Sequence, residues 1–115
     1  MTNPSSEDPL IGDEVLEIRL HPYHVHFVFV GSILQLGAPF EVGSQGFSTT
    51  VIDPEKNKGD LAVLWSLVGK VVSTVNWNET LTITFTDNTV ISIDPNNGQL
   101  RGTIMGRHDM TIEDF

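Results

Sequence analysis

The residues best suited to chemistry are histidines that lie close together near the start of the chain. His24 and His26 are two positions apart in the run HPYHVH. Residues two apart in a β-strand point to the same side, so both imidazoles would face one side of a sheet. Two such imidazoles can bind zinc, nickel or iron when carboxylates from neighbouring strands complete the ligand set. His24 and His26 are therefore a candidate metal site. His21 could add a ligand, but it stands before Pro22 in a turn, and no carboxylate is identified. The alternative is an ordinary surface or cross-strand pair of histidines.

The sequence contains no pattern typical of an active site. It has no cysteine, which excludes a thiol nucleophile, a disulfide framework and a Cys-ligated zinc. The G-x-S-x-G sequence of many serine hydrolases and the glycine-rich loop that binds phosphate are both missing. We therefore expect that the protein is not an enzyme and holds no cofactor.

Acidic residues far outnumber basic ones. The 115 residues include 15 Asp and Glu against 6 Lys and Arg, a formal net charge of −9. Binding to nucleic acid or to an anionic membrane relies on clustered Lys and Arg, so this charge argues against both. It suits a basic protein partner, because opposite potentials speed the encounter. The alternative is that the charge serves only solubility.

The acidic side chains gather near the two ends of the chain. They would form one patch if the first and last strands were neighbours. The candidate partner-binding residues of this kind are Glu14, Glu17, Asp109, Glu113 and Asp114.

The two tryptophans have different surroundings. Trp65 falls on the apolar stripe of a predicted helix, so we expect it in the core. Trp77 stands between Asn76 and Asn78 at the end of a predicted strand. It is either a lid over the core or an exposed anchor for a partner, because exposed tryptophans are enriched at binding hot spots. We therefore include Trp77 among the candidate partner-binding residues.

The elements that must position these residues are mostly β-strands. Apolar and polar residues alternate along much of the chain, and turn residues separate the alternating runs. Gly31-Ser32 and Asp87-Asn88 are typical of hairpin turns, and 94–98 (DPNNG) of a turn. We expect Gly37, Pro39 and Gly43 to break the strand that includes 33–36. The predicted strands are 15–20, 24–30, 33–36, 47–52, 70–77, 80–86, 90–93 and 100–105.

One segment has the spacing of a helix. In LAVLWSLVG, apolar residues recur at helical intervals at Leu61, Leu64, Trp65 and Val68. Asp60 is a suitable N-cap, and Gly69 a suitable residue just beyond the last turn. A helix of about eight to ten residues is too short to be stable alone, so it must pack on a sheet.

The two halves of the chain resemble each other. The alternating strands match at one constant offset, and so do two prolines that follow them. We therefore predict a mainly β (α+β) fold of two antiparallel three-stranded meanders in a pseudo-duplicated arrangement, with one short helix between them packing on the sheet. The alternative is that two unrelated meanders look alike. The matching positions are Val25 with Leu81, Phe27 with Ile83, Phe29 with Phe85 and Pro39 with Pro95.

Composition changes only near the ends. We expect a flexible leader over 1–12, a single β-rich domain over 13–106 and an acidic C-terminal tail over 107–115. The first residues show neither the positive nor the apolar region of a signal peptide, and no apolar run approaches the length of a membrane span. These features predict a soluble protein of the cytoplasm.

Three runs resemble a family of small bacterial proteins called domain of unknown function 6188. The runs are GSILQLGAPFEV, TTVIDP and LWSLVGKVVSTVNWNETLTITFTDNTVISI. The family's L-x-G-R-x-V ending of a helix is matched by Leu67, Gly69, Lys70 and Val72, with Lys in place of Arg. Its L-x-L-x-F-x-D-G strand is matched by Leu81, Ile83, Phe85 and Asp87, with Asn88 in place of Gly. A stretch of Pro and Trp that often follows is replaced by DPNNGQLRG. The resemblance covers about residues 15–105 and implies a shared fold, without an activity.

Three functional hypotheses follow. The first is a protein-binding module, in its concrete form an immunity protein that neutralises a toxin, since the chain is small, acidic and without a catalytic motif. The second is a small-ligand or metal-binding β domain that uses His24 and His26. The third is a homodimer in which strand edges such as Val90–Ile93 pair between chains.

Overall fold

The structure is a computed structural model that describes residues 10–44, 49–55, 61–77, 80–94, 101–107 and 112–115. These residues form ten strands and one short helix, α2 (Leu61–Trp65). The first five strands are β1 (Val15–Leu20), β2 (Val25–Phe29), β3 (Ser32–Leu36), β4 (Phe40–Ser44) and β5 (Thr49–Ile52). The others are β6 (Val72–Trp77), β7 (Leu81–Phe85), β8 (Thr89–Ile93), β9 (Gly102–Gly106) and β10 (Ile112–Asp114).

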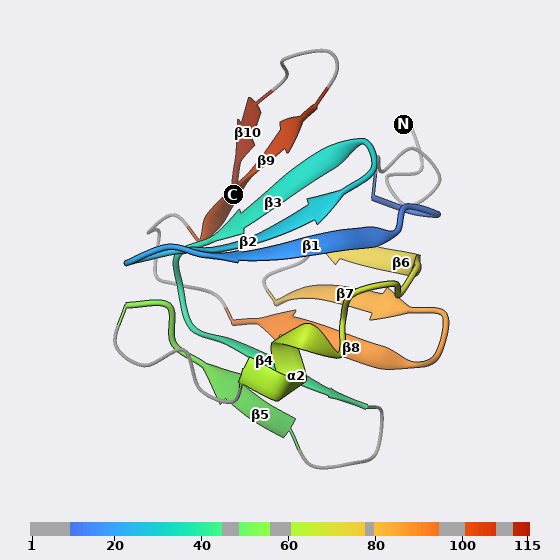
Figure 1. Cartoon of the computed structure of the whole chain (residues 1–115), viewed down its shortest axis with the longest axis horizontal. Helices are drawn as coiled ribbons and strands as arrows, with labels where there is room; N and C mark the ends of the chain where they lie inside the picture. Colours follow the sequence, from blue (N-terminus) through green and yellow to red (C-terminus); the bar gives the residue numbers. More distant parts are fainter. Residues whose placement is uncertain (1–9, 45–48, 56–60, 78–79, 95–100, 108–111) are drawn as a thin grey trace.

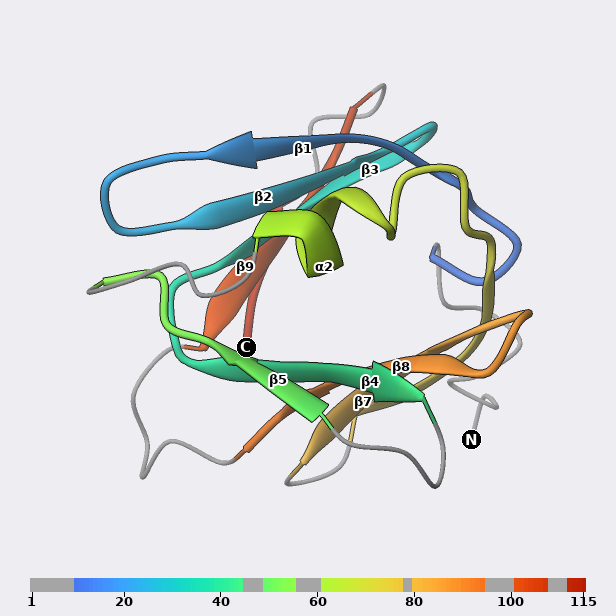
Figure 2. The ribbon, with the colours of Figure 1, turned by 60° about the horizontal axis from the view of Figure 1, so that its bottom comes forward.

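The strands form two five-stranded antiparallel sheets. Sheet I has the order β1-β2-β3-β9-β10, and sheet II has the order β5-β4-β8-β7-β6. The sheets lie as two layers, and α2 lies between them at one side (Figures 1 and 2). The predicted mainly β class, with antiparallel pairing and one short helix, is confirmed.

Each half of the chain contributes to both sheets. The consecutive strands β1-β2-β3 form a meander in sheet I, and β6-β7-β8 form a meander in sheet II. The next two strands of each half then cross over. The pair β4-β5 joins β8, and the pair β9-β10 joins β3 (Figure 1). The halves are therefore interlocked through exchanged strand pairs.

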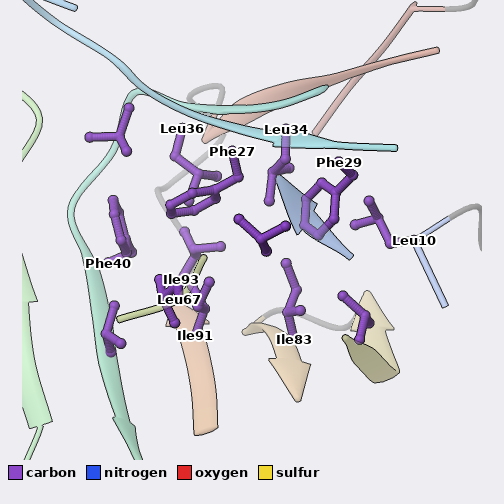
Figure 3. Packing of buried hydrophobic residues seen from close by; sticks show 14 of the residues in the cluster. Leu10, Phe27, Phe29, Leu34, Leu36, Phe40, Leu67, Ile83, Ile91 and Ile93 are labelled. Atoms are coloured by element: carbon purple, nitrogen blue, oxygen red, sulfur yellow. The ribbon is translucent and has the colours of Figure 1, made fainter. Parts of the chain in front are cut away.

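The core lies between the inner faces of the two sheets. The alternating residues of β2 and β7 point inward, so that Phe27, Phe29, Ile83 and Phe85 are all buried. The ring of Phe27 meets the edge of the Phe40 ring from the opposite sheet, with 5.8 Å between ring centres. Figure 3 shows Phe27, Phe29, Phe40 and Ile83 converging from both layers. Burial of this continuous apolar interior is the main stabilising contribution.

The same short motif, Leu-x-Gly, precedes each meander. Leu10 and Gly12 stand before β1, and Leu67 and Gly69 stand before β6. Both leucines are fully buried. Both glycines have positive φ, 85° and 92°, a conformation that side-chain-bearing residues rarely adopt. The glycine therefore lets the chain turn sharply, so that the leucine enters the core just before a strand begins.

These two motifs bond to each other in a twofold pattern. The amide of Val15 donates to the carbonyl of Lys70, and the amide of Val72 donates to the carbonyl of Asp13, both at 2.9 Å. The amides of the two glycines bond in the same reciprocal way, to the carbonyls of Val72 and Val15, both at 2.8 Å. The starts of β1 and β6 thus join the sheets at one corner.

Several predicted boundaries need correction. The helix covers only Leu61–Trp65 and is followed by turns over 66–69; its predicted N-cap, Asp60, lies outside the described residues. Gly43 does not end a strand, because β4 runs through it and pairs with strands on both sides. Trp65 is 53 % exposed, so its assignment to the core is wrong. The apolar stripe faces the core through Leu64 and Leu67 instead.

The ends of the chain contribute to the fold where they are described. Residues 1–9 of the predicted leader and 108–111 of the predicted tail lie outside the described residues, as do the turn residues 95–98. Ile112–Asp114 form β10, which pairs with β9 in sheet I. Phe115 packs against the core. No helix formed by the described residues has the length and apolarity needed to span a membrane.

Candidate functional site

The histidines of the predicted metal site cluster on the outer face of sheet I. His26 lies in β2 between the buried Val25 and Phe27, so its ring points outward. The turn between β1 and β2 is closed by a 2.9 Å hydrogen bond from the amide of His21 to the carbonyl of His24. The His26 ring centre lies 4.1 Å from that of His21 and 6.2 Å from that of His24. The structure therefore places the imidazole of His21 beside that of His26.

The environment of His26 keeps its ring neutral. Burial, followed by the charges of His21, His24 and Arg19, lowers the pKa of His26 from 6.5 to about 4. A hydrogen bond with Gln35 offsets part of this lowering. A neutral imidazole is the form that binds metals. The neighbours of His26 across the sheet are Arg19 and Gln35, and neither is a carboxylate.

A complete set of metal ligands is not found in the described part of the chain. Its His, Asp and Glu side chains include no group of three or more that could hold a metal ion. The rings of His21 and His26 are in contact and tilted, with 32° between their planes. Metal binding by His24 and His26 therefore stays a prediction.

The candidate acidic residues lie far apart in sheet I. Glu17 is in β1, where it accepts a 2.6 Å hydrogen bond from Arg19 that lowers the pKa of Glu17. Glu113 and Asp114 are in β10, at the opposite edge of the same sheet. Glu14 stands just before β1, in a bridge to Val71. Because β2, β3 and β9 separate the two edges, these residues do not form one patch. Asp109 lies outside the described residues.

Trp77 is half-buried at the end of β6. Its ring meets the Phe115 ring edge-on, with 5.1 Å between centres. The guanidinium of Arg101 lies 5.9 Å from the centre of the same Phe115 ring. The main chain of Phe115 is held by hydrogen bonds with Arg101 and Gly102. Trp77 thus packs against the core next to Phe115, as a lid over the core would.

Trp65 is the more exposed of the two tryptophans. Val68, one turn further along, is also exposed. The 2.8 Å hydrogen bond from the amide of Gly69 to the carbonyl of Val15 brings this segment beside the start of β1, where Leu16 is exposed. We call this region the helix–β1 surface. It comprises Glu14, Leu16, Glu17, Trp65 and Val68.

Sequence reasoning missed this surface because it misjudged which side of the helix faces inward. Leu64 and Leu67 are three apart and share the buried side, which leaves Trp65 and Val68 on the other side. The available signal was the match between Leu67 and Leu10, each placed two residues before a glycine. That repeated motif identifies Leu67 as a core residue and so sets the orientation of the helix.

Comparison of the chain with protein-family models, curated proteins and solved structures finds no match. The resemblance to domain of unknown function 6188 therefore stays a prediction. Function is inferred below from the residues and their surroundings.

Proposed function

We propose that the protein is a small binding module that captures a basic protein partner through the helix–β1 surface. Its concrete form is an immunity protein, which neutralises a toxin by covering it. The observation that carries this proposal is the exposure of Trp65, together with that of Val68 on the same segment and of Leu16 at the start of β1. A tryptophan that packs into a partner's pocket contributes large apolar area with few rotatable bonds, which is why tryptophan is frequent at hot spots.

Charge supports a basic partner for this surface. Glu14 and Glu17 flank Leu16 in the sequence and are exposed at the rim of the apolar group. The net charge of −9 adds a long-range attraction for any basic protein. Rim charges mainly change the association rate, whereas a central aromatic anchor mainly changes the dissociation rate. The surface therefore combines an apolar centre with an acidic rim.

The test uses purified products of the neighbouring genes as probes. Binding of the full chain to each basic product is measured by calorimetry at low and at high salt. We expect one product to bind, Trp65→Ala to weaken that binding by about tenfold or more, and salt to weaken it further. Val51→Ala, at an exposed valine in β5 of sheet II, is the matched control and should leave binding unchanged. Equal binding by wild type and Trp65→Ala, or no binding to any basic product, would overturn the proposal.

We also infer that the two interlocked halves arose by tandem duplication. The Leu-x-Gly motifs and the reciprocal hydrogen bonds between them support this view, because unrelated meanders have no reason to share them. The bulges support it as well, since each lies near the start of the meander's first strand, at Val15–Glu17 and at Val72–Thr74. The arrangement is that of a pseudo-duplicated pair of meanders.

A metal site at His24 and His26 is the second candidate. The observation in its favour is that the His24 and His26 rings lie near each other, with 6.2 Å between their centres. The test is the melting temperature of untagged protein with added Zn²⁺ or Ni²⁺. A rise that disappears in His24→Gln would support the site, and an unchanged melting temperature would remove it.

A further inference from the structure

The outer face of sheet I carries an unusual row of apolar side chains. Residues directly opposite each other in antiparallel strands share a face, so the register defines rows across the sheet. What we call the apolar row begins at Glu17 in β1 and continues through four apolar residues to β10. These are Val28, Ile33, Met105 and Ile112. The polar row beside it is Arg19, His26, Gln35, Thr103 and Asp114. Ile112, at the end of the apolar row, is 70 % exposed.

The equivalent face of sheet II serves as an internal reference, because it has the same topology. Its corresponding row is Thr74, Thr84, Val90, Gly43 and Thr49. Val28 is thus matched by Thr84, and Met105 by Gly43. The fold itself therefore does not require apolar residues on an outer face. This row holds four apolar residues on sheet I but one, Val90, on sheet II, whose outer face also carries the exposed Val51. The larger apolar share on sheet I favours that face as the one a partner covers.

We propose that a second copy of this chain covers the outer face of sheet I, in a symmetric face-to-face dimer with its twofold axis along β3. An axis along the middle strand reverses the strand order of the facing copy. It therefore places β1 of one copy over β10 of the other. Two sheets packed in this way lie about 10 Å apart with their side chains interdigitated.

The charges at the two edges of the face fit such a dimer. Arg19 in β1 and Asp114 in β10 lie in the same row, so each would meet the other in the partner copy, twice over. Asp114 is held in place by a 2.7 Å hydrogen bond from the hydroxyl of Thr103. The bond from Arg19 to Glu17 uses one of the five N–H donors of the guanidinium. Oppositely charged edges are self-complementary under this axis.

The centre of the face fits the same axis. Ile33 in β3, which is half-buried, lies on the axis and would pack against its own copy. Val28 is already buried within its own chain, at 3 % exposed, so the half-buried Met105 and the exposed Ile112 supply the remaining apolar contact. The row residues Glu17, Arg19 and Asp114 carry −1 in total, against −9 for the chain. Charge repulsion between two copies at this face is therefore small.

The experiment is sedimentation equilibrium of the full chain from micromolar to millimolar concentration. We expect a monomer–dimer equilibrium that Ile33→Thr weakens by about tenfold or more. Val90→Thr, the same type of change at the equivalent position of sheet II, is the control and should leave the dimer intact. A chain that stays monomeric throughout, or equal loss of dimer in both variants, would overturn the proposal.

A charge exchange tests the orientation of the copies. Arg19→Asp and Asp114→Arg should each weaken the dimer, whereas the double variant should restore it, because the edge charges are then merely exchanged. Circular dichroism of each variant shows whether it is folded. Two single variants without effect, or a double variant weaker than either single one, would exclude this axis.

Discussion

Sheets I and II have the same arrangement of strands, and they differ in the residues on their outer faces. Their inner faces are alike, since Phe27 and Phe29 in β2 correspond to Ile83 and Phe85 in β7, and all four are buried. Their outer faces differ, because the row that holds Val28, Ile33, Met105 and Ile112 on sheet I is mostly threonine on sheet II, with Val90 as its one apolar side chain. Core positions must be apolar to fill the shared interior, whereas the residue types on an outer face depend on whether solvent or a partner contacts it. The difference therefore directs attention to sheet I.

The two sheets also differ in the residues that anchor their equivalent hairpin turns, Asp13 in one half of the chain and Lys70 in the other. Asp13 precedes β1 and accepts hydrogen bonds from the amides of Val30 and Gly31 in the β2–β3 turn, both at 3.0 Å. Lys70 precedes β6 and pairs instead with the carboxylate of Asp87 in the β7–β8 turn. Asp13 and Lys70, whose charges have opposite signs, thus hold equivalent turns beside the starts of equivalent strands.

The largest expected effect tests whether the two inner faces are equivalent. Phe27→Ala should lower the free energy of unfolding by about 3–5 kcal/mol, and Ile83→Ala by about 2–5 kcal/mol. Both leave cavities between the same two layers. Urea denaturation followed by tryptophan fluorescence measures both losses. A loss of less than about 1 kcal/mol in either variant would contradict the equivalence of the two faces.

A smaller effect separates the two turn anchors. Asp13→Ala removes three hydrogen bonds that its carboxylate accepts, from the amides of Glu14, Val30 and Gly31, and should cost about 1–3 kcal/mol. Lys70→Ala removes one surface ion pair and should cost less than about 1 kcal/mol. Thermal unfolding of both variants under the same conditions gives the comparison. A greater loss in Lys70→Ala would show that the ion pair is the stronger anchor.

The two glycines of the Leu-x-Gly motifs should behave alike. Alanine at positive φ is strained, so Gly12→Ala and Gly69→Ala should each cost about 1–2 kcal/mol. Within the described part of the chain, a Cβ added at either position meets nothing within 4 Å, so the expected loss comes from backbone strain. Chemical denaturation measures both. Clearly unequal losses would weaken the inference of duplicated halves.

The smallest expected effect concerns pH and only sheet I. The pKa of His26 is lowered to about 4 in the folded protein, whereas the unfolded chain takes up the proton near pH 6.5. The contribution of neutral His26 is therefore complete above pH 6.5 and is lost as the pH falls toward 4. His26→Gln should flatten the fall of stability in this window, and His24→Gln serves as the control. An unchanged pH profile in His26→Gln would show that other groups cause the fall.

The strands were predictable where the pattern is local. Alternation at Val25, Phe27 and Phe29 is enough to define β2, and Asp87-Asn88 is enough to define a turn, in which Asn88 adopts a φ of 71°. β4 was missed because Pro39 and Gly43 suggest an interruption. Pro39 lies just before the strand, where its missing N–H does no harm. Glycine is tolerated in β4 because strands on both sides pair with it.

The candidate sites were harder to predict, because they depend on strand order. The acidic residues were expected to meet, but exchange of the strand pairs places β1 and β10 at opposite edges of sheet I. Trp65 was expected inside, yet a helix of five residues has no periodicity long enough to show which side faces the core. The contact between Trp77 and Phe115 links residues 38 positions apart and leaves no local signal.

The sequence by itself determined the β class, the two meanders and the inward faces, since each depends on the two-residue period of a strand and on the chemistry of neighbouring turns. Only the tertiary structure decided which hairpin joins which sheet, which outer face is apolar and which tryptophan is exposed. These features result from contacts between distant segments. Many strand orders satisfy the same local pattern, and they differ in free energy only through the packing of the whole interior.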